Sequence, residues 1–367
     1  MARTIVISIS IILIHINSFS IDFKKIEEHV KNTPKAVTKS VNELSKYLVS
    51  PFKNDDEKFA SIYFWVAKNI SYSVEMKNAN ITYNVNKELV DYVIKNKKGV
   101  CQHYSELFNE LSNLAGLESF LILGYGKERG KVMDLAHAWN AIRINKNWYF
   151  IDATWGAGYI QNNKFKKEFD LKYFMVKPEE FIKDHISFDP MWQLIDKPLK
   201  YEEFNSGKSS NIKSKKFDFN DTIKNYFLMD KKNQLISTIR RMNENGQKNK
   251  LVNDKLKSEN EHLNYLNQKT EVDKINDAVS HYNKAVDKFN NFNSLLNKKN
   301  AGKKISYSEL ETEIKSSENE ANAAKNIYLG VNSSDKSINS TKNQSLKQIE
   351  KMLNLIEKQK AVIKKYK

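Results

Sequence analysis

Cysteine is almost absent from this chain of 367 residues, which holds a single one, Cys101. A lone thiol cannot form an internal disulfide, so no disulfide framework is expected. The histidines are scattered, and none pairs with another histidine or with Cys101 at a familiar zinc-ligand spacing. Gly-rich phosphate loops and EF-hand patterns are missing as well. The sequence therefore predicts neither a metal site nor a bound cofactor.

Proline is confined to the first part of the chain, since all five prolines lie at or before Pro198. From about residue 217 onward the chain lacks this helix breaker and is rich in Lys, Asn, Glu and Leu. Apolar residues recur there at alternating steps of three and four, the spacing of a heptad seam. The two seams comprise Val272, Ile275, Val279, Tyr282, Val286, Phe289 and Leu296, and then Leu346, Ile349, Leu353, Ile356 and Ile363. Polar interruptions between the seams predict several antiparallel helices in a hairpin or bundle.

The positive charge is concentrated in the second part of the chain. The net charge is +16, and residues 1–208 carry 29 basic against 25 acidic residues, whereas residues 209–367 carry 31 against 19. The excess lysines alternate with Glu and Asn rather than with aromatic residues, which is typical of solvated helix faces. We therefore expect no nucleic-acid partner, and favour a weak contact with anionic surfaces as the use of this charge.

Long apolar runs are missing except near the N-terminus. Residues 1–20 combine a positive start, an apolar stretch at 5–16 and a small-x-small triplet at 18–20, the three parts of an export signal. The stretch is shorter than the roughly 20 residues that span a bilayer. Cleavage near Ser20, giving a secreted or periplasmic protein, is therefore favoured over an uncleaved membrane anchor. In an oxidising compartment, the unpaired Cys101 would have to be either buried or used.

The first part of the chain changes its hydrophobic period along its length. Residues 55–70 place apolar side chains three and four apart, which predicts a helix that buries one stripe. Residues 100–116 predict another helix, with Gly116 as its stop. Its apolar side comprises Leu107, Leu111 and Leu114. Short β-branched and aromatic runs follow, and helices before antiparallel strands predict an α+β domain whose sheet packs against the helix that begins at Cys101.

Composition divides the chain into four segments. Residues 1–20 are the expected signal peptide, and residues 21–205 are the expected folded domain, with its core at about 55–200. Residues 206–216, with Gly, Ser and Lys, are typical of a polar linker. Residues 217–367 are the expected helical, coiled-coil-like region.

Three residues with the chemistry of nucleophilic catalysis lie where this fold would bring them together. Cys101 begins a helix, whose partial positive charge and free N–H groups favour a thiolate and offer donors to an oxyanion. His137 begins a predicted strand and Asp152 lies near the end of the next one. A hairpin that turns at 145–147 would place position 137 close to position 152 or 153. Each residue alone is more often structural, but together they predict a Cys-His-Asp triad.

The segments around these residues resemble a known family. Three stretches carry the resemblance: GVCQHYSELFNELSNLAGL, AHAWNAIRINKNWYFIDATWGAG and YFMVKPEEFIKDHISFDPMWQL. They look like the transglutaminase-like superfamily, in particular its branch of kyphoscoliosis peptidase and fungal cytokinesis proteins, over about residues 55–200. The resemblance implies a papain-like transglutaminase core, followed here by a mainly α-helical region. It also implies that the catalytic positions are Cys101, His137 and Asp152.

Two further side chains bear on the expected site. Many members of the superfamily have a small residue two positions after the cysteine, where this chain has His103. That side chain would crowd the acyl site, affect the thiolate or point away along the helix, and we favour the last alternative because positions i and i+2 face roughly opposite sides. Of the five tryptophans, Trp155 is the one expected near the site.

The sequence thus predicts an exported, thiol-dependent enzyme that transfers acyl groups from peptide or glutamine amides. Hydrolysis, as in a cysteine peptidase, is favoured over cross-linking because transfer requires a cleft that selects an amine over water. The expected partners are a protein or peptide substrate and, through the tail, a second protein or another copy of the chain. The alternative is a non-catalytic binding or scaffolding protein that uses the domain for recognition and the tail for assembly.

Overall fold

The computed structural model describes the following residues: 21–77, 86–208 and 216–365. The predicted signal peptide at residues 1–20 lies outside this part of the chain. Among the described residues, the helices are all too short or too polar to cross a membrane.

The described residues form two compact units, each with its own hydrophobic core. The first unit takes in residues up to 228 and then Arg240–Lys255, and the second takes in Met229–Ile239 and residues from Leu256 onward. Most of the linker predicted at 206–216 lies outside the described residues, so its character stays a prediction. Helix α9 (Phe219–Leu228), which follows it, packs on the first unit through the buried side chain of Ile223.

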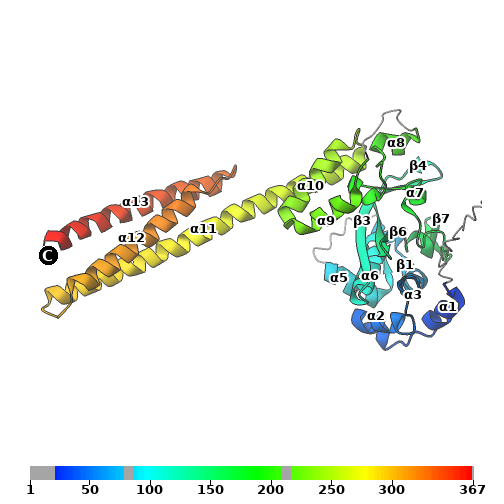
Figure 1. Ribbon diagram of the computed structural model, residues 1–367, viewed down its shortest axis with the longest axis horizontal. Coiled ribbons are helices and arrows are strands. Elements are labelled where there is room, and N and C mark those ends of the chain that lie inside the picture. The colour runs from blue at the N-terminus through cyan, green and yellow to red at the C-terminus, as the bar shows by residue number, and fades with distance from the viewer. Residues whose placement is uncertain (1–20, 78–85, 209–215, 366–367) are drawn as a thin grey trace, which may run out of the picture. The chain divides into compact units, whose positions relative to one another are not determined.

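Helix α3 (Asp55–Asn69) is the centre of the helical half of the first unit (Figure 1). It contacts α1 (Phe23–Lys31), α2 (Val41–Val49) and α6 (Cys101–Leu114). The prediction that α3 buries one stripe is wrong, because every side chain over residues 59–67 is buried. Neighbours on several sides of the helix remove the exposed face that an amphipathic surface helix would keep.

The other half of the first unit is an antiparallel sheet with the order β4-β3-β5-β6, and β9 also pairs with β3. Its strands are β3 (Glu118–Glu128), β4 (Lys131–Val132), β5 (His137–Ile144), β6 (Asn147–Ile151) and β9 (His185–Ser187). Helix α6 packs on β3 and β5, where the Asn140 amide donates to the Ser105 carbonyl at 3.1 Å. The fold is therefore α+β, with the cysteine-bearing helix against the sheet as predicted.

Helix α6 begins and ends where the sequence predicts. The short parallel pair of β1 (Ser71–Tyr72) and β2 (Lys98–Gly99) leads the chain into it. At the other end, Gly116 has a φ of +74°, the left-handed conformation that favours glycine after a helix. Leu107 and Leu111 are buried, but the prediction for Leu114 is wrong, since 40% of it is exposed. The turn brings the next leucine, Leu117, back into the core instead.

The hairpin of β5 and β6 is tighter than predicted. Its turn contains two residues, Asn145 and Lys146, whose φ angles of 50° and 69° are those of a type I′ turn. Asn140 pairs with Ile151 at the end of the ladder. If this register continued, position 137 would face position 154, so the prediction of 152 or 153 is wrong by at least one residue.

The second unit is a bundle of antiparallel helices: α11 (Lys250–Asn300) from Leu256 onward, α12 (Tyr307–Leu329) and α13 (Lys336–Lys365). The Ser317 hydroxyl donates to the Ala285 carbonyl across α11 and α12. Along α11, the predicted seam is wrong at Val272 and Val279, which are 42% and 40% exposed. The fully buried positions are Ala278, Ala285 and Phe292. The hydrophobic core that α11 shares with α12 and α13 therefore lies on a face that is rotated from the predicted seam. A coiled coil stays a prediction.

Smaller elements complete the chain. They are α4 (Val74–Lys77), α5 (Asn86–Asn96), β7 (Gly158–Gln161), β8 (Lys164–Lys167), α7 (Pro178–Phe181), α8 (Tyr201–Ser206), α10 (Lys231–Glu244) and three 3₁₀ turns, Val37–Lys39, Trp155–Ala157 and Pro190–Gln193.

Candidate active site

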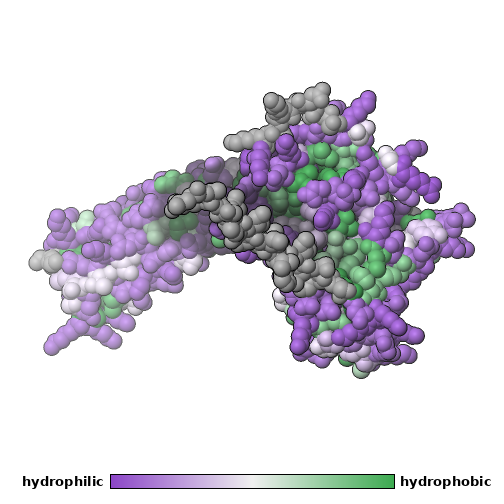
Figure 2. Space-filling model, turned by 45° about the vertical axis from the view of Figure 1, so that its right-hand side comes forward, coloured by the Kyte–Doolittle hydropathy of each residue, from purple (hydrophilic) through white to green (hydrophobic). Residues whose placement is uncertain are grey.

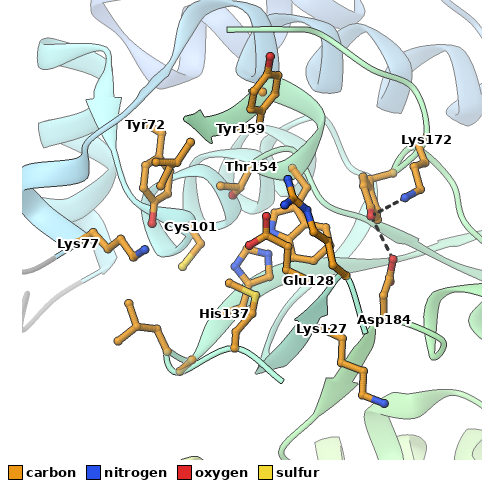
Figure 3. Close-up of a pocket in the computed structure, with 18 of the residues that line it drawn as sticks. Tyr72, Lys77, Cys101, Lys127, Glu128, His137, Thr154, Tyr159, Lys172 and Asp184 are labelled. Carbon is orange, nitrogen blue, oxygen red and sulfur yellow. Dashed lines mark hydrogen bonds between the residues drawn. The ribbon is translucent and has the colours of Figure 1, made fainter. Parts of the chain in front are cut away.

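A cavity of about 710 Å³ lies in the first unit beside the first residue of α6. Cys101, His137, Tyr72 and Thr154 are among the residues that line it. Figure 3 shows the side chains of Cys101 and His137 at this cavity. Cys101 is only half-buried, so that a molecule in the cavity would reach the thiol.

His137 and Asp152 form a buried hydrogen-bonded pair. The Nε2 of His137 donates to Oδ2 of Asp152 at 2.6 Å, and the two residues are 4% and 0% exposed. The other carboxylate oxygen accepts the backbone N–H groups of Thr154, at 2.8 Å, and Trp155, at 3.0 Å. Such a turn at the end of β6 fixes the carboxylate at the start of β5, although the ladder itself does not place Asp152 opposite His137.

The electrostatics of this pair favour a charged imidazole. Burial alone lowers the pKa of His137, but the charge and hydrogen bond of Asp152, together with Cys101, outweigh it and raise the pKa to about 10. Burial likewise works to raise the pKa of Asp152, yet His137 and His185 hold it well below its usual range. Because Nε2 is bound to Asp152, Nδ1 is the ring nitrogen left to face Cys101. These partners therefore favour the protonated imidazole beside the sulfur.

All three residues predicted for the site meet in this part of the structure. His137 contacts Asp152 directly, and Cys101 shares the cavity wall with His137 and contributes to its pKa. Trp155 also lies at the site as expected, with its ring 5.5 Å from that of His137. The catalytic roles themselves stay predictions.

His103 faces away from the cavity. Its Nδ1 accepts the N–H of Val100 at 3.3 Å, at the beginning of α6, and its ring lies 5.6 Å from that of Tyr92. Burial lowers the pKa of His103 to about 4, which keeps the ring neutral and able to accept this bond. A side chain at Gly99 would place its Cβ 2.4 Å from the His103 Cβ. His103 therefore caps the helix, in agreement with the favoured alternative.

His185 lies at the site and was not predicted from the sequence. It comes from β9, and its Nε2 lies 3.3 Å from the same Asp152 oxygen that binds His137. Its Nδ1 lies 2.6 Å from Oδ1 of Asp184. Spacing along the chain gives no hint of this contact, because it depends on the pairing of β9 with β3. The only signal was its place in one of the stretches that carry the family resemblance.

The ring nitrogens of His137 and His185 and a carboxylate oxygen of Asp152 all lie within 4.8 Å of one another, a cluster of the size that could hold a metal ion. Two ligands of a tetrahedral metal, each about 2.1 Å from it, lie roughly 3.4 Å apart. The 2.6 Å contact between His137 and Asp152 is too short for that and fits a hydrogen bond. Hydrogen bonding accounts for this cluster, and the absence of a metal stays a prediction.

The rim of the cavity mixes exposed apolar and cationic groups. Leu135, Tyr159 and Ile160 line it and are 43%, 48% and 40% exposed. The charged lining residues are Lys77, Lys127, Glu128, Arg129, Lys172, Lys183 and Asp184. Figure 2 shows apolar surface between hydrophilic areas on one face of the molecule. Such a rim offers both apolar contacts and donors to an extended chain.

Comparison with known proteins finds similarity in the part of the chain that contains this site. Residues 42–153 match the family model described as the transglutaminase-like superfamily. Kyphoscoliosis peptidase of Mus musculus is 27% identical over 198 residues, which are 52% of this chain and 30% of that protein. Cytokinesis protein 3 of Saccharomyces cerevisiae is 24% identical over 139 residues, 35% of this chain and 15% of that protein.

A solved structure described as "Crystal structure of a TGase" is 22% identical and covers 44% of this chain and 40% of its own, with a TM-score of 0.27. The chain spans less than a third of the length of the kyphoscoliosis peptidase that it matches. The similarity therefore concerns the first part of the chain. Residues 42–153 of that part match the transglutaminase-like superfamily, and the chain is similar there to kyphoscoliosis peptidase and cytokinesis protein 3.

Proposed function

We propose that the first unit is a thiol-dependent enzyme that transfers acyl groups from peptide or glutamine amides through Cys101, His137 and Asp152. The observation that carries this proposal is the buried His137, hydrogen-bonded to Asp152 and sharing the cavity wall with Cys101, where the raised pKa of its ring favours the imidazolium. An imidazolium beside a thiol stabilises the thiolate, which is the nucleophilic form.

The chemistry follows from these positions. The thiolate attacks the amide carbon, and the N–H groups at the beginning of α6 are placed to stabilise the resulting oxyanion. As the C–N bond breaks, Nδ1 of His137 gives its proton to the leaving amine, and a thioester remains on Cys101. Water, with His137 as its base, then releases the acid and restores the thiol. A second amine in place of water would give transfer.

Hydrolysis is the favoured outcome. Transfer needs a site that keeps water from the thioester while it admits an amine. The cavity has exposed residues on its rim, among them Tyr159 at 48%, so that water would reach Cys101. The chemistry is therefore expected to resemble that of a cysteine peptidase.

The proposal is tested with the variant Cys101→Ala. We expect the wild-type chain to release amine from generic protein or glutamine-containing peptides, and its thiol to react with an iodoacetamide probe at least tenfold faster than a model thiol at pH 7. The variant should lose at least 99% of the turnover, because the nucleophile is gone. His262→Ala, which alters an exposed histidine of α11 that does not line the cavity, serves as the control and should keep the activity. A wild-type thiol that reacts no faster than the model thiol would contradict the proposal.

The alternative is a non-catalytic binding protein. The exposed Leu135, Tyr159 and Ile160 at the rim favour contact with a peptide in either case. A binder would bind the same peptides with equal affinity after Cys101→Ala and would release no product. The antiparallel helices of the second unit would then serve assembly.

Export, and partners of the helical tail, are also proposed rather than established. The support for export is the apolar stretch at residues 5–16. The mass of the protein recovered from expressing cells tests it, since a signal cleaved near Ser20 shortens the chain by about 20 residues.

A further inference from the structure

His185 is enclosed between two carboxylates. Its Nε2 is 3.3 Å from Oδ2 of Asp152, and its Nδ1 is 2.6 Å from Oδ1 of Asp184. The other oxygen of Asp184 accepts the hydroxyl of Tyr173 at 3.0 Å, and Lys172 donates to that hydroxyl at 2.9 Å. Figure 3 shows the last two contacts as dashed lines that lead from the cavity rim to Asp184.

The hydrogens of this arrangement are strongly constrained. A carboxylate can only accept, so each ring nitrogen of His185 must carry a hydrogen if both contacts are hydrogen bonds. A neutral imidazole has one such hydrogen, and its bare nitrogen would face an oxygen lone pair. The remaining way to satisfy both contacts with a neutral ring is a proton on Asp184, which then donates to Nδ1.

The ring of His185 is shielded from water, whereas its partner Asp184 lines the cavity and is 29% exposed. His185 is 1% exposed. Its ring stacks on Phe181 at 4.1 Å and lies 4.4 Å from the ring of Trp155 and 5.3 Å from that of Trp139. Among the described residues, the titratable groups around it are Asp152 after β6, His137 on β5, and Asp184 and Tyr173 near β9 and α7. Two carboxylates therefore surround one ring in an apolar shell.

We propose that His185 is a positioning residue, held as an imidazolium between Asp152 and Asp184, that fixes Asp152 and limits how tightly this carboxylate holds the proton of His137. Asp152 then divides its charge between two cations, both on Oδ2. The ring centroids of the two histidines are 5.5 Å apart, so the charge on His185 disfavours the charge on His137.

Such a residue would help His137 to release its proton. An imidazolium held only by a buried carboxylate would be a poor acid for the leaving amine, whereas a second cation makes it a better one. This consequence rests on the proposed function. The charge state of His185 does not, and it is measurable in a chain that has no activity.

The experiment is an NMR titration of the full chain with ¹⁵N- and ¹³C-labelled histidine. His185→Gln identifies the His185 signals by their loss. At pH 8, we expect His185 to show two protonated ring nitrogens, although an ordinary histidine is neutral there. A single neutral tautomer at pH 8 in the folded chain would overturn the proposal, whatever the activity.

A second measurement follows His137 in the Cys101→Ala background, where the sulfur no longer raises its pKa and the titration lies closer to neutral pH. Adding His185→Gln should raise the midpoint of His137 by about half a pH unit or more, because the opposing charge is lost while a donor to Asp152 remains. A role in packing alone would leave this midpoint unchanged, and that result would also overturn the proposal.

Asp184→Asn is the matched control, since its amide can donate to Nδ1 and leaves His185 neutral. We expect the imidazolium signals of His185 to disappear at pH 8 while the fold is kept. If this variant keeps a doubly protonated ring, Asp184 is not the group that holds the charge. Loss of turnover with an intact His185 signal would instead count against the proposed function alone.

Discussion

At the scale of single residues, the site depends on charges that are held out of water by their partners. Asp152 is fully buried and accepts four donors, two from histidine rings and two from the backbone. A buried carboxylate is stable only when it is satisfied in this way. The same donors that stabilise the charge also orient His137 toward Cys101, so that stability and chemistry have one cause.

The raised pKa of His137 predicts a loss of stability at alkaline pH. A group whose folded pKa exceeds its unfolded value near 6.5 contributes fully below about pH 6.5, and this contribution is lost as the pH rises toward about 10. The free energy of unfolding of the first unit should therefore fall by roughly 1–3 kcal/mol between pH 7 and 9. Urea unfolding followed by tryptophan fluorescence measures it, because all five tryptophans lie in the first unit. His137→Gln should remove this part of the decline, and an unchanged slope in the variant would contradict the assignment.

Cys101, His137 and Asp152 were predictable from the sequence, and His185 was not. The first three occupy ends of elements that a helix pattern and a local hairpin define. His185 contacts Asp152 across 33 positions of the chain, through a strand of only three residues. Such a short strand has no readable period, and its pairing is decided by tertiary packing.

At the scale of elements, the beginning of α6 is built by a close approach of glycine and histidine. The ring of His103 occupies the space that a side chain at Gly99 would fill, and its Nδ1 holds the N–H of Val100. Cys101 is the next residue, so this contact sets where the nucleophile enters the helix. The sequence offered His103 only as an exception to the family pattern.

Gly99→Ala should therefore disturb the entry to α6. The new methyl group would meet His103 at 2.4 Å, and overpacking of this kind costs about 1–3 kcal/mol of unfolding free energy. In a His103→Gly background the cost of Gly99→Ala should be mostly lost, because that change removes both the Cβ and the ring carbons that the new methyl group would meet. The four chains form a double-mutant cycle, measured by urea unfolding. Costs that simply add would mean that the two residues do not touch.

The elements that departed from prediction did so for a shared physical reason. Sequence periodicity reports how many faces of a helix or strand are apolar, but not how many neighbours cover them. Helix α3 has neighbours on several sides, and α11 shares one hydrophobic core with α12 and α13, so their buried positions exceed or rotate from the expected stripes. The β5–β6 hairpin was correct in its pairing and wrong in its register, which a two-residue turn decided.

At the scale of the whole molecule, residues after the predicted linker are part of the first unit. Arg241 in α10 donates through Nε and a terminal nitrogen to both oxygens of Asp189, at 2.7 and 2.6 Å. The two side chains are 6% and 9% exposed. Asp189 also begins the turn after β9, the strand that supplies His185. A chain cut at the predicted boundary of residue 217 would thus lose a partner of the site's supporting structure.

Arg241→Leu should destabilise the first unit far more than the same change at its neighbour. Removing one partner of a buried ion pair leaves an uncompensated charge and costs about 3–5 kcal/mol. Arg240 pairs with Glu244 at the surface, where both side chains are about 60% exposed, and such pairs contribute less than about 1 kcal/mol. Arg240→Leu is therefore the matched control, and tryptophan fluorescence in urea compares the two. Equal effects would mean that the pair of Arg241 and Asp189 contributes no more to the stability of the first unit than a surface pair does.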